Sequence, residues 1–444
     1  MFKKPFVTTL AILLASAVIA PGYAQQMILD EEFSAAATSL AAPLRTSLVP
    51  HTNVHYVLIN DPNINAFVTG ENIVFVHSGL VAKANTAAAL QGVLAHELAH
   101  IAANHLLQRY ASSRHAAIGA MAGMVLGIGA AAAGSPQAAT AIAMGSQAGA
   151  IQSMLAHTRT QEAEADRRAI TALHSAGLSA QGMVEMFSTL RNESQLSYDS
   201  PPPWLVTHPL PPERLANLNG VTQSESAALK TGLEKTEASI NFPRLQAKVW
   251  ALTSTPAGTL RRYTGTDDIS RYARALAYFK QGKLDLASSN LEPLLKADPK
   301  DPYYRELKAK LALERSDLTA AGLIFAELAS EYPNAVLFQY QYAEILRNQS
   351  NFPAAAARYE RITRLWPQWT DPWMGLGLCY GNMGRIAESH LARTSGFIVA
   401  PDLDAAKLSL VLAKQYIGKL APSPEKTRSE EWAAALQSRL DTMK

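Results

Sequence analysis

Hydrophobic residues follow first a helical and then a strand period in the N-terminal part of the chain. Residues 29–47 carry Leu, Phe and Ala at helical spacing, and Pro43 is expected to interrupt or end this helix. Three short runs of strand-forming residues follow at 54–59, 66–68 and 73–76, separated by turn residues. The pattern predicts a helix and then a small sheet, which either covers the next helix or offers an edge strand to an extended peptide.

A longer helix is expected after the sheet. Asn85 or Thr86 can cap its start, and neither Gly nor Pro interrupts it between Gly92 and about Tyr110. Residues 116–150 are then rich in Ala and Gly, which favours a close-packed helical hairpin over a membrane span, because a span needs about 20 strongly apolar residues. An exposed apolar face on this hairpin could still make a peripheral contact with a membrane or a hydrophobic substrate.

The C-terminal half repeats with a period of 34 residues. Proline closes each repeat, and small residues recur in two columns that allow paired helices to approach closely. This pattern matches tetratricopeptide repeats, and we expect about four of them from residue 268 to roughly 401, with capping helices beyond and a last helix opening at Ser429. The recurring residues are Pro299, Pro333, Pro367 and Pro401; Ala275, Ala309, Ala343 and Gly377; and Ala287, Ala321, Ala355 and Ser389.

Stacked repeats of this kind form a curved array whose concave face binds peptides or proteins. Most aromatic residues in such arrays belong to the core. Residues 221–267 are expected to join the two parts of the chain, with breaks at 241–243 and 255–258. The candidate contacts for a protein partner are Tyr303, Tyr304, Tyr340, Trp366 and Trp369.

The first 24 residues are typical of a secretory signal peptide. Lys3 and Lys4 precede an apolar run, and small residues at Gly22 and Ala24 indicate cleavage before Gln25. An uncleaved membrane anchor is the alternative. Cleavage after Ala24 removes two lysines and no acids, so the formal net charge falls from +3 to +1.

Composition narrows the remaining classes. The 444 residues have near-average hydrophobic content, which fits a globular protein of two or three domains, and nothing in the modest charge points to nucleic acid. Cys379 is the only cysteine, so no intramolecular disulfide can form. An exported protein of this size without disulfides suits a bacterial periplasm.

Two histidines lie in the middle of the long predicted helix. His96 and His100 are four residues apart, so their imidazoles would stand on one face and can grip one metal ion. Glu97 would lie about 100° further round the helix, close enough to take a proton from a water molecule on the metal. This is the zinc hydrolase arrangement, although so short a motif also occurs by chance in helices with solvated histidines.

A second acidic segment offers the ligand that two histidines lack. Zinc needs a third protein ligand, and a carboxylate from another helix can supply it. Glu162 and Asp166 are four residues apart, so Glu162 can bind the metal while Asp166 accepts the free ring N–H of a ligating histidine. Glu164 is expected to point elsewhere and to be solvated. Without the two histidines, the segment would indicate an exposed helix start beside Arg167 and Arg168.

A third motif follows a proline-rich loop. Three consecutive prolines at 201–203 favour an extended backbone that leads to Thr207-His208-Pro209, and Pro212 is expected to open another helix. His208 on such a loop can approach the metal as a fourth ligand that blocks water, or donate to the oxyanion of a tetrahedral intermediate. Alternatively, it merely packs the loop.

Together these motifs resemble the gluzincin metallopeptidases related to the HtpX heat-shock protease and the CAAX prenyl protease. The likeness covers roughly residues 28–220. It implies one zinc ion per chain, bound by His96, His100 and Glu162, with Glu97 as the general base. HtpX has membrane spans, whereas this chain has a signal peptide and the Ala/Gly-rich hairpin, so soluble periplasmic relatives are closer. The residues that carry the resemblance are His96–His100, Glu162–Asp166 preceded by Arg159, Thr207–Pro209 with Arg214, and Asn65–Phe67.

The resemblance, together with the repeats, implies a periplasmic zinc endopeptidase. It would degrade unfolded or misassembled outer-membrane proteins and assist their assembly, with the repeats contacting the assembly machinery. The alternative is a repeat-based chaperone or scaffold whose peptidase domain is idle or tightly autoinhibited.

The fold expected from these patterns is mainly α with a small β-sheet. A zincin-like α+β metallopeptidase domain precedes an all-α tetratricopeptide-repeat solenoid. The expected bounds are 1–24 for the signal peptide, 25–225 for the peptidase domain, 226–267 for linker helices, and 268–444 for the repeats with their capping helices.

Overall fold

The computed structural model describes residues 27–69, 72–105, 108, 159–196, 204–205 and 208–443. The expected signal peptide, the 116–150 hairpin, the three prolines at 201–203 and Thr207 lie outside these residues. The chain divides into two compact units. The first, here called the helix–sheet unit, consists of Ala36–Tyr56 and Asp61–Phe242; the second, the solenoid unit, contains the chain up to Ala35, Val57–Asn60 and the chain from Pro243 onward.

A four-stranded sheet has the strand order β1-β2-β4-β3. β1 pairs antiparallel with β2, with Met27 opposite Ile59, and β3 pairs antiparallel with β4, with Phe67 opposite Phe75. The three strands expected from the sequence are confirmed, while β1 was not predicted because two residues are too few to show a period. The strands are β1 (Met27–Ile28), β2 (His55–Ile59), β3 (Ala66–Val68) and β4 (Ile73–His77).

The first helix corrects the expectation for Pro43. α1 (Glu31–Leu48) continues through this proline to Leu48 instead of ending at it. Leu40, Ala41 and Leu44 on either side of the proline are completely buried. Burial of this apolar face therefore outweighs the hydrogen bond that the proline removes.

α3 (Ala87–Ala102) follows the short α2 (Ser78–Lys83), which was not predicted. Thr86 caps α3 by accepting from the amide of Ala89 at 3.0 Å, as expected. The helix ends at Ala102, well before the expected end near Tyr110. Asn104 adopts a φ of 53°, in the left-handed region, which breaks the helical path.

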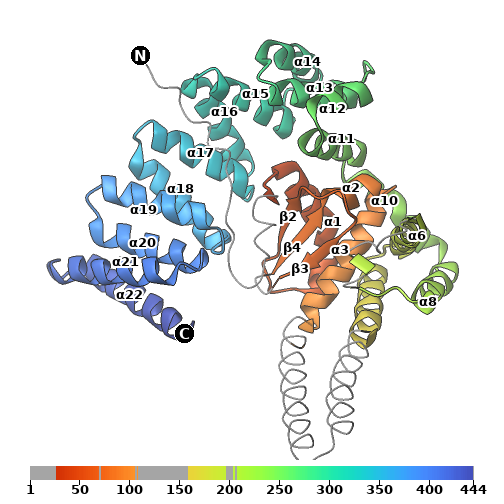
Figure 1. Ribbon diagram of the computed structural model, residues 1–444, viewed down its shortest axis with the longest axis horizontal. Helices are drawn as coiled ribbons and strands as arrows, with labels where there is room; N and C mark the ends of the chain where they lie inside the picture. The colour runs from red at the N-terminus through yellow and green to blue at the C-terminus, as the bar shows by residue number, and fades with distance from the viewer. Residues whose placement is uncertain are drawn as a thin grey trace, which may run out of the picture. The chain divides into compact units, whose positions relative to one another are not determined.

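α3 packs against β3, α6 and α10, and Figure 1 shows it beside the sheet. A Cβ on Gly92 would lie 2.7 Å from the amide nitrogen of Met183, and one on Gly182 would lie 2.0 Å from the carbonyl oxygen of Ala88. The two helix backbones thus approach so closely that only glycine fits. Among the described residues of this unit, the remaining helices are residues 159–175, α6 (Gln181–Leu196), α8 (Pro212–Gln223), α9 (Ala227–Lys230) and α10 (Gly232–Ser239).

α10 anchors the start of α3. The Glu237 carboxylate accepts from the amides of Ala87 and Ala88 at 3.0 and 2.9 Å, and Thr236 donates to the side chain of Gln91 at 2.9 Å. A carboxylate at a helix N-terminus also complements the helix dipole. α10 therefore supports the helix that carries the histidines. The domain bounds expected from the sequence stay a prediction.

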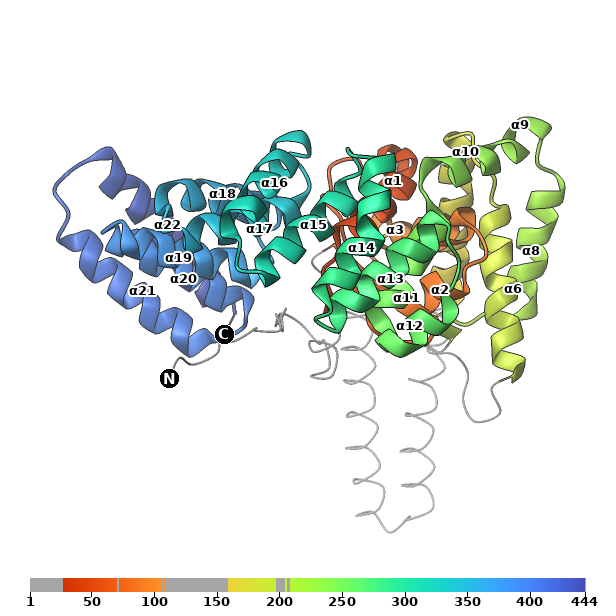
Figure 2. The same ribbon diagram turned by 90° about the horizontal axis from the view of Figure 1, so that it is seen from above.

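The solenoid unit is entirely helical from α11 onward. Figures 1 and 2 show its consecutive helices stacked as pairs, and the described residues contain four such pairs from α13 to α20. Its helices are α11 (Phe242–Thr253), α12 (Pro256–Arg262), α13 (Asp268–Lys280), α14 (Leu284–Ala297), α15 (Pro302–Glu314), α16 (Leu318–Glu331), α17 (Val336–Asn348), α18 (Phe352–Leu365), α19 (Thr370–Asn382), α20 (Ile386–Val399), α21 (Leu403–Gly418) and α22 (Pro424–Thr442).

The small-residue columns occupy the expected places. Ala275, Ala309 and Ala343 are completely buried on the first helix of their pairs. On the fourth pair, Ser389 donates to the carbonyl of Gly377 at 2.6 Å, and a Cβ on that glycine would lie 2.7 Å from the side chain of Arg393. The closely packed helix pairs that the period predicted are confirmed.

Two expectations for the repeats are wrong. Tyr304, Tyr340, Trp366 and Trp369 are buried and belong to the core, and Tyr303 is half-buried against it, so these side chains are not free partner contacts. Their rings fill the space between adjacent helices. The last helix begins at Pro424, capped by Ser423, rather than at Ser429.

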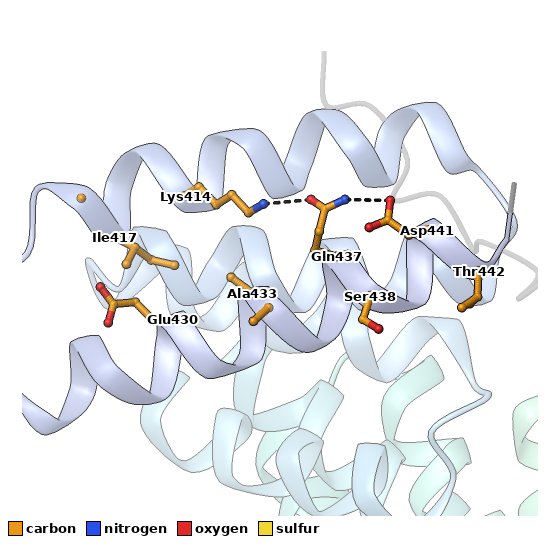
Figure 3. A pocket seen from close by; sticks show the side chains of 10 residues that line it. Lys414, Ile417, Glu430, Ala433, Gln437, Ser438, Asp441 and Thr442 are labelled. Carbon is orange, nitrogen blue, oxygen red and sulfur yellow. Dashed lines mark hydrogen bonds between the residues drawn. The ribbon is translucent and has the colours of Figure 1, made fainter.

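A groove of about 810 Å³ lies between α21 and α22. Figure 3 shows a chain of hydrogen bonds along it: Lys414 donates to Gln437 at 2.8 Å, and Gln437 donates to Asp441 at 3.2 Å. Among the described helices, none combines the length and the apolar character that crossing a bilayer requires.

A buried ion cluster holds the start of α1 within the solenoid unit. The Lys248 ammonium lies 2.7 Å from Asp30, 3.4 Å from Glu32 and 3.6 Å from Glu306. Arg244 bridges Glu32 and Asp301 at 2.6 Å each. Burial opposes the charge on Lys248, but the surrounding carboxylates outweigh it and raise its pKa well above the usual value.

Replacing Lys248 with Met should lower the free energy of unfolding by about 3–5 kcal/mol, because the buried carboxylates lose their counter-ion. Lys310→Met is the matched control: this lysine contacts the same Glu306 at 2.6 Å but is partly exposed, so it should cost less than about 1 kcal/mol. Urea denaturation followed by circular dichroism measures both. Equal losses for the two variants would contradict the role of the buried cluster.

Candidate metal site

Three elements bring the candidate ligands together. α3 carries His96 and His100 on one face, the helical residues 159–175 carry Glu162, and His208 precedes α8. All four side chains are buried, and one ligand atom from each lies within 4.8 Å of the others. The structure therefore joins the three motifs that are far apart in the sequence.

The distances between these atoms fit a metal ion. Nε2 of His96 lies 3.1 Å from Nε2 of His100 and 3.2 Å from Oε2 of Glu162, and Nε2 of His100 lies 3.5 Å from Oε1 of Glu162. Ligand atoms about 2.0–2.1 Å from a tetrahedral ion are about 3.3 Å apart. Imidazole nitrogen and carboxylate oxygen are also the donor types that zinc and similar ions take.

Asp166 lies behind His96, as expected from its spacing. Its Oδ1 is 3.0 Å from Nδ1 of His96, on the side of the ring away from the other ligands. Arg214 holds this carboxylate with two hydrogen bonds of 2.7 and 2.8 Å and donates to the carbonyl of Pro209 at 2.6 Å. The arginine thereby ties the loop of His208 to the helix of Asp166.

The carboxylates remain ionised despite their burial. Burial favours the neutral form of Glu162, but His208 and His96 outweigh it and hold its pKa well below the usual value. For Asp166, hydrogen bonds from His96 and Arg214 likewise outweigh burial and lower its pKa. Burial also opposes the charge on His96, yet the two carboxylates raise its pKa to about 9. A metal ion would thus replace a proton held on His96.

His208 faces the candidate ligands rather than only packing its loop. Its Nδ1 lies 3.1 Å from both carboxylate oxygens of Glu162, and its Nε2 lies 3.6 Å from Oε1 of Glu97. The ring is stacked on Trp204, with centroids 4.8 Å apart and an interplanar angle of 24°. Glu97 is buried on α3 beside this ring.

Sequence reasoning missed several residues around the ligands. Trp204 supports both His208 and His96, with ring centroids 5.7 Å apart in the second pair, and it packs on Phe187 at 5.2 Å. Trp204 directly follows the three prolines, which is the only signal in the sequence for its role. No spacing indicates Phe187, whose ring centroid lies 5.2 Å from the guanidinium carbon of Arg214.

Glu164, expected to point elsewhere and to be solvated, lies outside the ligand cluster but is only partly exposed, and it contacts His105, for which no expectation was made. His105 is buried with its Nδ1 2.9 Å from Nδ1 of His100. Glu164 does not stand apart in solvent: its carboxylate lies 3.4 Å from Nε2 of His105 and accepts from Arg168 at 2.8 Å. The hydrogen bond from Arg168 leads the groups that lower the pKa of Glu164.

The sequence of this chain is similar to known peptidases and repeat proteins. Residues 26–222 match the sequence profile of peptidase family M48, and residues 272–336 match a tetratricopeptide repeat. The beta-barrel assembly-enhancing protease of Escherichia coli K12 is 28% identical over 375 residues, which cover 81% of this chain and 75% of that protein. The protein of the same name from Yersinia pestis is 27% identical over 385 residues, covering 83% and 76%. The solved MamA structure is 18% identical with a TM-score of 0.31, covering 36% of this chain and 97% of that one.

The affinity for a divalent metal ion should rise with pH up to about 9 and then level off. Below that pH, His96 of the metal-free chain carries a proton that the metal must displace, so each unit of pH should change the apparent affinity up to about tenfold. Chelator competition between pH 7 and 10 measures this dependence. In Asp166→Asn the levelling should begin at lower pH; an unchanged or flat profile would contradict the assignment.

Proposed function

We propose that this chain, which carries a peptidase family M48 domain followed by tetratricopeptide repeats, is a periplasmic zinc-dependent endopeptidase acting in the quality control of outer-membrane proteins. The observation that carries the proposal is the buried cluster of His96, His100, Glu162 and His208 next to Glu97. M48 peptidases are metal-dependent, and the donor set suits one zinc ion per chain.

When bound, zinc would polarise the scissile carbonyl and make a water molecule more acidic. Glu97 is the general base: its carboxylate takes a proton from the attacking water and returns it to the nitrogen of the leaving amine. The ligand residues are removed from solvent, so charges within the site interact more strongly than they would in water. Asp166 holds the Nδ1 proton of His96 and leaves its Nε2 free for the metal.

His208 is assigned as the fourth ligand. Its ligand atom lies with those of the other three residues, and stacking on Trp204 holds the ring toward them. A histidine in this position occupies the place that water or substrate needs on a catalytic zinc. In this arrangement the site is inhibited until the loop of His208 moves. Donation from His208 to an oxyanion is the other role open to it.

The substrates in this proposal are unfolded or misassembled outer-membrane proteins. The names of the relatives point to β-barrel assembly, and the N-terminal 24 residues fit export to the periplasm. The repeats are assigned to contact the assembly machinery, because such arrays bind proteins. Because the aromatic residues of the repeats are buried, exposed apolar side chains are the candidates for this role, among them Leu378 on α19 and Leu408 on α21.

Digestion of casein with and without a chelator, combined with metal analysis, tests the proposal. Chelator-sensitive cleavage and about one zinc per chain support it. A repeat-based chaperone or scaffold with an idle peptidase domain would suppress aggregation without cleaving. Comparing folded with unfolded outer-membrane protein as substrate then separates general quality control from the processing of one partner.

Glu97→Gln should retain about one zinc per chain and lose cleavage by about 10²–10⁴-fold, because the amide cannot accept the proton from water. Metal analysis and a peptide-cleavage assay check the two halves of this prediction. Glu213→Gln, an exposed change on α8, is the matched control and should behave as wild type. A fully active Glu97→Gln variant would sink the assignment of the base.

His208→Ala should raise cleavage several-fold if His208 blocks the position that water needs. Initial rates on an unfolded substrate, at equal metal loading, measure the effect. His51→Ala, at an exposed position, serves as the control. A large fall in rate would instead favour stabilisation of the oxyanion by His208.

A further inference from the structure

His105 lies against a candidate ligand although the helical period does not place it there. It lies five positions after His100, which on a continuous helix would turn its side chain about 140° away. α3 ends at Ala102, and Asn104 has a φ of 53°. This left-handed residue redirects the chain, and the rings of His105 and His100 come to lie with centroids 5.0 Å apart.

We propose that His105 is a positioning residue that fixes the tautomer and orientation of His100 for metal binding. The inference rests on the proposed function only in taking His100 as a ligand. Nδ1 of His105 lies 2.9 Å from Nδ1 of His100, which is a hydrogen-bonding distance between two buried rings. One of these two nitrogens therefore carries the shared proton.

The position of Nε2 of His100 decides whether the proton lies on Nδ1 of His100 or on Nδ1 of His105. Nε2 of His100 lies 3.1 Å from Nε2 of His96 and 3.5 Å from Glu162, so it faces the metal position and must be unprotonated to bind. The proton of His100 is then on Nδ1 and is donated to His105. His105 in turn must carry its own proton on Nε2.

The second nitrogen of His105 has an acceptor in the required place. Nε2 lies 3.4 Å from Oε2 of Glu164, and Arg168 holds the other oxygen of that carboxylate at 2.7 Å. The donors thus run in one direction, from His100 through His105 to Glu164. The backbone carbonyl of His105 also accepts from Gln161 at 3.5 Å, which ties the residue to the helix of Glu162.

The two ligating histidines are supported differently. Asp166 places a buried carboxylate directly on His96, whereas His100 meets a neutral ring first, and Glu164 beyond it is partly exposed. His105 should therefore act mainly through orientation. Removing such a partner of a metal ligand typically lowers metal affinity about 10–100-fold.

The test is the affinity of the full-length chain for Zn²⁺, measured by chelator competition. His105→Leu removes the acceptor and should weaken binding about 10–100-fold. His105→Asn can place an oxygen near the former Nδ1 and should recover most of that loss. His51→Leu, at an exposed position, is the matched control and should bind as wild type.

Two further readouts separate positioning from mere packing. The visible spectrum of the Co²⁺-loaded chain should change in His105→Leu and stay close to wild type in His105→Asn. Unfolding of the metal-free chain reports packing, and a purely structural role would shift it in both variants without this difference in metal affinity. If His105→Leu does not fold, Glu164→Ala should lower Zn²⁺ affinity by a smaller factor, and wild-type affinity there would overturn the inference.

The result also distinguishes this inference from the proposed function. A wild-type chain that binds no Zn²⁺ would defeat both. Wild-type binding and cleavage, with unchanged affinity and an unchanged Co²⁺ spectrum in His105→Leu, would overturn the role of His105 alone. Equal weakening in His105→Leu and His105→Asn would also overturn it.

Discussion

Burial of ionisable groups around one point is the constraint on which the helix–sheet unit depends. His96, His100, Glu162 and His208 are all removed from water, and an unpaired charge in such a place is costly. Each group therefore needs a fixed partner. Asp166 contacts His96, and Arg214 donates to the loop of His208. The candidate ligands face one another at a point where a cation can compensate the charge of the Glu162 carboxylate.

This need for partners explains why distant segments converge. Arg214 contacts Asp166, Glu162 and Pro209, so one side chain couples the acidic helix to the loop that carries His208. Trp204 fills the apolar side of the same loop and packs on Phe187 of α6. A change in the loop would disturb both the charge balance and this packing, which is the physical link between loop position and the proposed inhibition.

The sequence predicted the parts of the site that follow a period. The spacing of four residues identified His96 with His100 and Glu162 with Asp166, and the 34-residue period identified the helix pairs. His105 escaped because the left-handed Asn104 breaks the period between it and His100. The predicted helix end at Pro43 is wrong because burial of its apolar face keeps α1 intact where the local preference of proline would end it. The roles of Trp204 and Phe187 depend on contacts between segments, which no local pattern encodes.

α3 is fixed at its N-terminus and along its contact with α6, and this bears on how accurately the candidate ligands are held. Glu237 occupies its N-terminus, where negative charge is favourable, while His100 lies in its last turn, where a bound cation is favourable. Close contact at Gly92 and Gly182 prevents the helix from shifting along α6. Metal sites tolerate displacements of only about 0.5 Å, so the caps and the glycine contacts are as much a part of the site as the ligands. α10, which lies beyond the peptidase profile in the sequence, therefore belongs physically to the support of the helix that carries His96 and His100.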